Sequence, residues 1–189
     1  MESNNHREDK IAATVKELSR PENLQSVCHM RWQGEPLPSQ QAVEEIVDLC
    51  HALLFPGFFG YGDVNKFNIE YHTGIRTERL YSLLVNQITA GLCFSVDCSK
   101  APDLDNIKPQ AEEKALEFIT SLPQLRQILG TDVRATYLGD PAAISTDEVI
   151  YCYPAIRAIA NYRIAHRLIE LQVPIIPRMI SEHAHRETG

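Results

Sequence analysis

The sequence has 189 residues, of which 44% are hydrophobic and 23% are charged, a composition typical of a globular domain with a sizeable core. Its net charge of −7 gives a surface that repels phosphate, so we expect neither nucleic acid nor a membrane as a partner. The polar N-terminus lacks the pattern of a signal peptide, and no apolar run approaches the roughly 20 residues that span a bilayer. The cysteines are odd in number and irregularly spaced, which indicates free thiols and a cytoplasmic protein. They are Cys28, Cys50, Cys93, Cys98 and Cys152.

Two segments near the N-terminus have the apolar periodicity of amphipathic helices. Residues 7–20 carry Ile11, Val15 and Leu18 on one helical face. Residues 39–55 form a stronger pattern, because Ser39 can cap the first turn and the apolar residues make a broad stripe. That stripe comprises Val43, Ile46, Val47, Cys50, Leu53 and Leu54. We therefore predict a short first helix and a longer second helix that contributes to the core.

The middle of the chain alternates between loop and helical patterns. Residues 56–63 read PGFFGYGD, a turn-rich aromatic loop, and residues 77–94 predict a third long helix. Loop composition returns over residues 97–109. Residues 110–138 predict two more helices, divided by Pro123, which we expect in the first turn of the second one.

The last fifty residues begin with a tight Gly-Asp-Pro turn at 139–141. Residues 145–148 form a capping box of the Ser-x-x-Glu type, which predicts a short helix. Tyr153 precedes a proline and should end that helix, a further helix is predicted over 154–171, and a final one begins near Pro177. No segment shows the sustained alternation typical of strands, so we predict an all-α fold of about six to eight helices.

The histidines near the C-terminus raise the question of a metal site. On a helix, His183 and His185 point about 200° apart and cannot share a metal ion. Glu182 and His185 do have the Glu-x-x-His spacing of di-iron helical bundles, which require a second copy of that motif and two further carboxylates. No second Glu-x-x-His occurs in the chain. We therefore expect no metal ligands, and a metal-binding bundle that uses Glu182 and His185 is a weaker alternative.

Two further polar features have both a structural and a functional interpretation. One stripe of the helix predicted over 154–171 carries Arg163, His166, Arg167 and Glu170. Such a stripe is more often a solvated or interface face than a catalytic one. Asp140 lies between Gly139 and Pro141, where it can serve as a cap or Asx-turn residue, or display its carboxylate to the ammonium group of a substrate. No phosphate-binding, dinucleotide-binding or hydrolase motif occurs.

Three stretches carry a resemblance to a known family: GDPAA at 139–143, YPAIRAIANYRIAHRL at 153–168 and VPIIPRMISEHAHRETG at 173–189. Together they resemble the helical region of bacterial-type serine acetyltransferases, which has a DPA turn, a YRIAH helix and a connecting segment that ends in TG. The upstream half resembles the extended helical arm of longer members. The resemblance covers most of the chain and is most specific over residues 139–189.

The resemblance implies the N-terminal helical domain of such a protein, without its catalytic left-handed β-helix of hexapeptide repeats. Residues 1–20 would be a polar lead and first helix, residues 21–172 the helical domain, and residues 173–189 the connection to the β-helix. In the family the β-helix follows the TG segment directly, and the sequence ends at Gly189. The expected fold class is therefore all-α, with the β-helix absent.

The family transfers an acetyl group from acetyl-CoA to the hydroxyl of L-serine, which gives O-acetylserine for cysteine biosynthesis. By resemblance, Asp140 helps to bind the amino group of L-serine, or of L-cysteine as an inhibitor. The catalytic histidine and the residues that bind acetyl-CoA belong to the β-helix. We therefore expect no catalytic residue and no cofactor site among these residues, and no activity of the chain alone.

The resemblance also bears on partners. The helical domains of the family assemble trimers into hexamers, so we expect a homo-oligomer, and a non-catalytic oligomerisation module is the alternative function. The family's partner O-acetylserine sulfhydrylase binds the extreme C-terminal tail of the β-helix domain. We do not expect that complex with this chain.

Overall fold

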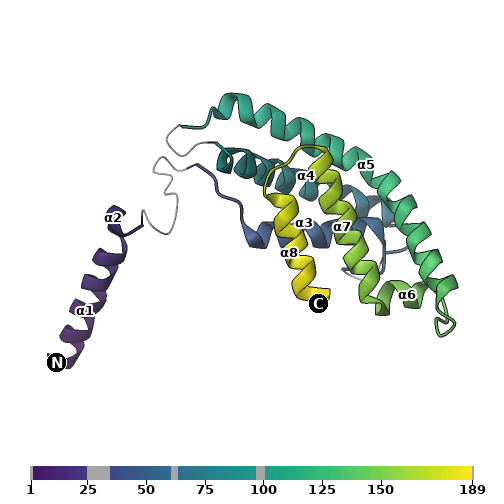
Figure 1. Ribbon diagram of the computed structural model, residues 1–189, viewed down its shortest axis with the longest axis horizontal. Coiled ribbons are helices and arrows are strands. Elements are labelled where there is room, and N and C mark those ends of the chain that lie inside the picture. The colour runs from purple at the N-terminus through teal and green to yellow at the C-terminus, as the bar shows by residue number, and fades with distance from the viewer. Residues whose placement is uncertain (1, 25–34, 61–63, 97–100, 189) are drawn as a thin grey trace. The chain divides into compact units, whose positions relative to one another are not determined.

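The computed structural model describes residues 2–24, 35–60, 64–96 and 101–188 of the chain. Cys28, His29, Gly62, Cys98 and Gly189, which entered the sequence interpretation, lie outside these residues. Helices account for all the regular elements of the described residues, and this confirms the all-α prediction (Figure 1). None of the described helices combines the length and the apolar character needed to cross a membrane.

The chain divides into two compact units. The first contains residues 1–35 and 96–101, with helices α1 (Glu2–Leu18) and α2 (Pro21–Leu24). The predicted first helix is therefore present. Its apolar residues Ile11, Val15 and Leu18 are all exposed. Asn23 of α2 donates hydrogen bonds to Glu17 at 3.0 Å and so ties the two helices together.

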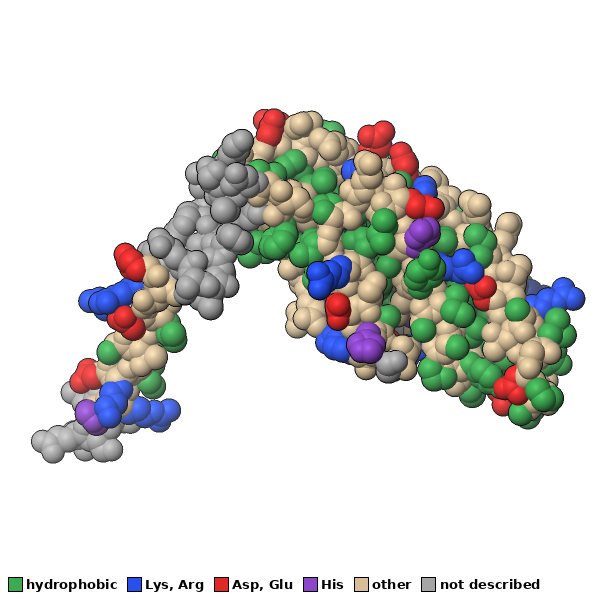
Figure 2. Space-filling model, in the orientation of Figure 1, with side chains coloured by type: hydrophobic (Ala, Val, Ile, Leu, Met, Phe, Trp, Pro, Cys, Tyr) green, Lys and Arg blue, Asp and Glu red, His purple; other side chains and the backbone are tan. Residues whose placement is uncertain are grey.

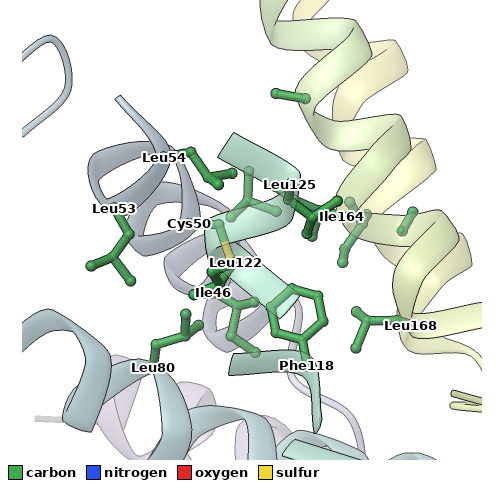
Figure 3. Packing of buried hydrophobic residues seen from close by; sticks show 14 of the residues in the cluster. Ile46, Cys50, Leu53, Leu54, Leu80, Phe118, Leu122, Leu125, Ile164 and Leu168 are labelled. Atoms are coloured by element: carbon green, nitrogen blue, oxygen red, sulfur yellow. The ribbon is translucent and has the colours of Figure 1, made fainter. Parts of the chain in front are cut away.

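The second unit contains residues 36–95 and 102–189 and holds six helices among the residues that the structure describes. They are α3 (Gln40–Leu54), α4 (Ile69–Phe94), α5 (Leu104–Gly139), α6 (Thr146–Cys152), α7 (Pro154–Glu170) and α8 (Ile176–Thr188). All six helices contribute to one apolar core, α6 through Val149 and Ile150. Figure 3 shows the centre of this core, where Phe118 of α5 lies between Ile46 of α3 and Leu168 of α7.

Helix α3 begins and packs as the sequence predicts. The Ala42 amide donates to the Ser39 side chain at 3.4 Å, and the Ser39 amide donates to the side chain of Gln87 on α4 at 2.8 Å. All six residues of the predicted apolar stripe are buried. The helix ends in a turn-rich segment where Gly57 and Gly60 adopt φ values of 86° and 82°, which glycine tolerates without strain.

Helix α4 is longer than its apolar pattern indicates, since it starts at Ile69 rather than near residue 77. Its first two turns face solvent, and the first buried residue of the helix is Leu80. An exposed turn has no apolar periodicity for a sequence pattern to detect. The start is instead organised locally, because the Asn68 side chain accepts a hydrogen bond from the Asn65 amide at 2.7 Å.

The prediction of two helices divided at Pro123 is wrong, and the predicted loop extends too far toward residue 109, because α5 is one helix from Leu104 to Gly139. Asp103 caps it by accepting from the Asn106 amide at 3.3 Å, and both Pro109 and Pro123 lie inside it. Figure 1 shows α5 curving over the neighbouring helices. Proline is favoured in the first turn, but that preference is only statistical and can be overridden by packing.

Packing on both sides of Pro123 accounts for the continuity of α5. The helix buries Ile107, Ala111, Ala115, Phe118, Leu122, Leu125, Leu129 and Val133. An interior proline costs about 3 kcal/mol, whereas each fully buried Leu or Phe contributes about 1.5–3 kcal/mol. The Ser121 hydroxyl also donates to the Phe118 carbonyl at 2.6 Å, one residue before the Ile119 carbonyl to which an amide at position 123 would donate. The burial of this face outweighs the cost of the proline.

The C-terminal helices follow the predicted pattern. Ser145 accepts from the Glu148 amide at 3.1 Å at the start of α6, and Pro154 is the first residue of α7. After α7, the Val173 amide donates to the Leu168 carbonyl at 2.9 Å across Gln172, which has a left-handed φ of 55°. The chain then packs against α4, where a Cβ on Gly91 would lie 2.9 Å from the Pro174 carbonyl oxygen.

Candidate functional site

Asp140 ends α5 and begins the turn that leads to α6. Its backbone is extended, and its amide donates to the Thr136 carbonyl at 3.1 Å, which closes the last turn of the helix. The Ala142 amide donates to Asp140 Oδ1 at 2.9 Å, and the Ala143 amide donates to the Asp140 carbonyl at 3.1 Å. The side chain therefore forms an Asx turn, the structural role that the Gly-Asp-Pro sequence favours.

The second carboxylate oxygen of Asp140 has a partner distant in the sequence. The hydroxyl of Tyr153, which lies between α6 and α7, donates to Asp140 Oδ2 at 2.6 Å. Tyr153 and, to a smaller extent, the Ala142 amide lower the pKa of Asp140, because both stabilise the ionised carboxylate. The same hydrogen bond raises the pKa of Tyr153 to about 12. Asp140 is consequently an anion at neutral pH.

No cation neutralises this anion within the part of the chain that the structure describes. The ion pairs of lysine, arginine and histidine there all involve other carboxylates. Asp132, eight residues earlier on α5, does have a cation as its partner. Arg163 of α7 holds its two oxygens at 2.7 and 2.8 Å in a bidentate pair. Asp132 therefore serves to join two helices, whereas the charge of Asp140 is uncompensated.

The polar stripe predicted on α7 lines a hollow of about 250 Å³ between α5 and α7. The His166 ring stacks on Tyr162 with centroids 5.7 Å apart, and Glu170 lies 3.5 Å from His166 and 3.1 Å from Arg167. The charged groups of this stripe thus pair with one another or with Asp132. Ser121 also lines the hollow, and its hydroxyl donates to the Phe118 carbonyl of its own helix at 2.6 Å.

The histidines near the C-terminus lie on α8, as the helical prediction requires. His183 lies 3.6 Å from Glu44 of α3 and 3.5 Å from Glu187, and Arg186 binds Glu44 at 2.7 Å. His185 is exposed on another side of the helix. Across the described ranges, no three histidine, cysteine, aspartate or glutamate side chains gather as a metal site would require. Glu44 and Arg186 thus place His183 in a salt-bridge cluster between two helices.

His51 is a buried group that sequence patterns did not single out as part of a site. Its ring lies between α3 and α7 beside Asn161 and Phe59, and only 2% of the residue is exposed. Burial, and next the nearby Arg157 guanidinium, lower the pKa of His51 to about 4. Within the described residues, neither ring nitrogen forms a hydrogen bond of good geometry. His51 is therefore a neutral component of the core.

Tyr153 is the component of the Asp140 site that sequence reasoning missed. It is 13 residues from Asp140 and belongs to a different element, so no local pattern joins the two. The sequence does predict the short capped helix between them, and that helix determines their separation. Cys50 and Cys152 of the described chain are free thiols, as predicted.

Fold and site together define a multi-helix domain that presents an ionised carboxylate on a turn between two helices. No protein-family model matches the chain. A plasmid-encoded serine acetyltransferase of Synechococcus elongatus is 35% identical over 159 residues, which are 83% of this chain and 50% of that protein. A serine acetyltransferase of Mycobacterium tuberculosis is 38% identical over 58 residues, or 31% of this chain and 25% of that protein.

Solved structures give the same result. The crystal structure of Entamoeba histolytica serine acetyltransferase 1 in complex with L-cysteine matches with a TM-score of 0.60 and 27% identity, covering 75% of this chain and 46% of that one. The native form of that enzyme matches with a TM-score of 0.59 and 25% identity over 82% of this chain and 50% of that one. This chain is therefore a homologue of serine acetyltransferases and corresponds to their N-terminal helical region. It spans about half the length of these relatives.

Proposed function

We propose that this chain is the helical part of a serine acetyltransferase, which transfers the acetyl group of acetyl-CoA to the hydroxyl of L-serine. The similarity over 83% of the chain and the common helical fold support this assignment. Acetyl-CoA is the proposed co-substrate, bound by residues outside these 189. We propose no cofactor and no catalytic residue within them.

The proposed role of Asp140 is to bind the α-amino group of the amino acid. The observation that carries this proposal is the uncompensated charge of a carboxylate that two donors hold in place. An ammonium group is the natural counter-ion of such a carboxylate, since it supplies both charge and hydrogen-bond donors. L-serine and L-cysteine have the same α-ammonium group, so both are proposed ligands. Support for L-cysteine comes from related Entamoeba structures that contain it.

Binding measurements with an Asp140→Asn variant test this role. Asparagine keeps the size and the acceptor oxygen of the Asx turn but removes the charge. We expect the affinity for L-serine and L-cysteine, measured by calorimetry, to fall about tenfold or more, because a charge-assisted bond is lost. Asp147→Asn, which removes an exposed carboxylate from the first turn of α6, is the matched control. Equal affinities of the two variants would contradict the proposed role of Asp140.

Catalysis is tested separately by the release of free CoA from acetyl-CoA and L-serine. We expect the 189-residue chain alone to show no measurable turnover, because general-base catalysis needs a base within hydrogen-bond reach of the serine hydroxyl. We assign no such group to this chain. Robust turnover would show that the catalytic groups lie within these residues.

A second candidate function, assembly of several copies of this chain, is favoured by exposed apolar side chains near the Asp140 turn. Leu138, Ile144 and Tyr151 are 71%, 83% and 62% exposed. Figure 2 shows hydrophobic side chains gathered on the surface around α6 and the adjacent end of α5. Contiguous apolar surface is typical of interfaces. By resemblance the proposed assembly is a hexamer, and sedimentation at high concentration would refute it by finding only monomer.

A further inference from the structure

We propose that Tyr153 is a positioning residue of the amino-acid site, and that its hydroxyl fixes the orientation of the Asp140 carboxylate without neutralising its charge. This inference rests on the proposed function of Asp140. It adds a residue that makes no direct contact with the amino acid. It also explains why a tyrosine stands where α6 ends and α7 begins.

The carboxylate of Asp140 is held from two independent directions. The Ala142 amide of its own turn donates to Oδ1 at 2.9 Å, and the Tyr153 hydroxyl donates to Oδ2 at 2.6 Å. An Asx turn alone leaves the second oxygen free to rotate with the side chain between solvent and ligand. With both oxygens held, the carboxylate has one orientation before the amino acid arrives. Such pre-organisation reduces the entropy lost on binding.

Tyr153 is itself well anchored. Its ring packs against the apolar core of the second unit, and its backbone is fixed between the last turn of α6 and the first proline of α7. The Tyr153 amide donates to the Val149 carbonyl at 3.3 Å. The start of α6 is held as well, because Glu148 accepts from the Ile144 amide at 2.6 Å while its own amide donates to Ser145. The short helix therefore returns the chain to the Asp140 turn at a defined distance.

The donor to Asp140 Oδ2 is a phenol rather than a charged group. A carboxylate can accept about four hydrogen bonds, and two of these positions at Asp140 are occupied. A phenol is a neutral donor, so the carboxylate keeps its full negative charge for a cationic ligand. Asp132 shows the alternative, since the bidentate Arg163 both orients its carboxylate and cancels its charge. Of these two carboxylates, the one at Asp140 is oriented and keeps its charge.

The Tyr153 hydroxyl should also affect how ligand binding at Asp140 depends on pH. The Tyr153 hydroxyl is the main cause of the lowered pKa of Asp140, and the other titratable groups near Tyr153 are Glu148 and Cys152. A carboxylate with a lowered pKa stays ionised, and so binds an ammonium group, down to a lower pH. Without the hydroxyl the pKa of Asp140 rises, and binding should be lost at a higher pH as the solution is acidified.

The test compares Tyr153→Phe with the control Tyr151→Phe, which removes a hydroxyl two residues away. The Tyr151 hydroxyl donates to the Gly57 carbonyl at 3.4 Å and not to Asp140. L-serine and L-cysteine affinities are measured over a pH series. We expect Tyr153→Phe to weaken binding about three- to tenfold at neutral pH, the usual effect of one hydrogen bond. We also expect it to move the acidic limb of the profile to higher pH. Tyr151→Phe should change neither property.

The variants Asp140→Asn and Tyr153→Phe distinguish a failure of the positioning role of Tyr153 from a failure of the Asp140 site. If Asp140→Asn weakens binding about tenfold or more while Tyr153→Phe matches wild type in affinity and pH profile, the positioning role is wrong and the Asp140 site stands. If Asp140→Asn has no effect, the proposed site is wrong. The hydrogen bond between Tyr153 and Asp140 can also be tested without ligand, by carboxyl-carbon NMR titration of Asp140. The pKa of Asp140 should be higher in Tyr153→Phe than in wild type, and an unchanged pKa would overturn the inference.

Discussion

At the scale of single residues, one buried histidine should make the stability of the helical core depend on pH. The pKa of His51 is about 4 in the folded chain, below the ordinary value of 6.5. Between these two pKa values, His51 is protonated in the unfolded chain but neutral in the folded chain. The free energy of unfolding is therefore unaffected by this group above about pH 6.5. It decreases as the pH falls toward 4, by about 3 kcal/mol in total.

The variant His51→Gln removes this titration. Urea unfolding between pH 7 and pH 5 should show a smaller loss of stability with acid in His51→Gln than in wild type, whatever the stability of the variant at pH 7. His185→Gln, at the exposed histidine of α8, is the matched control. Parallel pH profiles for wild type and His51→Gln would show that the ring is not kept neutral by burial.

A second prediction at this scale concerns the titration of Tyr153. Its pKa is raised to about 12, chiefly by the hydrogen bond to Asp140. In Asp140→Asn the phenol should titrate near its ordinary value of about 10. Difference absorbance of the phenolate, with Tyr153→Phe subtracted to identify the signal, measures this change. A phenol that titrates identically with and without the Asp140 charge would contradict the geometry of the site.

Of the two side chains at the candidate site, the sequence alone indicates Asp140 but not Tyr153. Asp140 was recognisable because a Gly-Asp-Pro turn and a family motif coincide there. Tyr153 was interpreted only as a residue that ends a helix before a proline. Its hydroxyl reaches Asp140 because α6 reverses the chain, and such a contact depends on tertiary structure rather than on a local pattern. For the same reason the burial of His51 could not be inferred from its neighbours in the sequence.

At the scale of elements, the contact of α4 with the segment between α7 and α8 gives a sharp prediction. A Cβ on Gly91 would lie 2.9 Å from the Pro174 carbonyl oxygen, whereas a Cβ on Gly74 of the same helix meets nothing within 4 Å. Gly91→Ala should destabilise the chain by about 1–3 kcal/mol, because backbone must move. Gly74→Ala should stabilise it by about 0.5–1 kcal/mol through helix propensity. Thermal unfolding that ranks the two variants equally would contradict the close packing at Gly91.

The end of α7 gives a prediction of opposite sign. Gln172 has a φ of 55° in a helix-terminating motif that usually contains glycine at this position. Gln172→Gly should therefore stabilise the chain by about 1 kcal/mol, since a left-handed backbone costs other residues about 1–2 kcal/mol. Gln127→Gly, within α5, is a control that should destabilise it. A lower midpoint of denaturation for Gln172→Gly would contradict the assigned backbone conformation.

The helices themselves show where sequence patterns succeed. Ser39, the capping box at 145–148 and Pro154 were interpreted correctly, because a cap or a first-turn proline acts through neighbouring residues. Pro123 was interpreted incorrectly, because burial along both halves of α5 outweighs the local preference of proline. The sequence pattern does not reveal the start of α4, because its first two turns face solvent and bury no apolar residue.

At the scale of the whole molecule, the exposed apolar residues near α6 predict self-association. Ile144→Lys places a charge on the most exposed of these residues near the Asp140 turn. If copies of the chain meet through this surface, the variant should sediment as a smaller species than wild type at the same concentration. Asn106→Lys, at an exposed position on the opposite end of α5, should leave the association unchanged. Identical sedimentation of Ile144→Lys and wild type would exclude this surface from the interface.

The central claim, that the turn after α5 binds an amino acid through Asp140, has a direct test in amide NMR of the labelled chain with increasing L-serine. We predict that the amides of residues 140–143, with Ala142 foremost, and of Tyr153 shift together and saturably, and that Asp140→Asn abolishes these shifts. Saturable shifts confined to another surface, such as the hollow between α5 and α7, or no shift at the turn, would contradict the account.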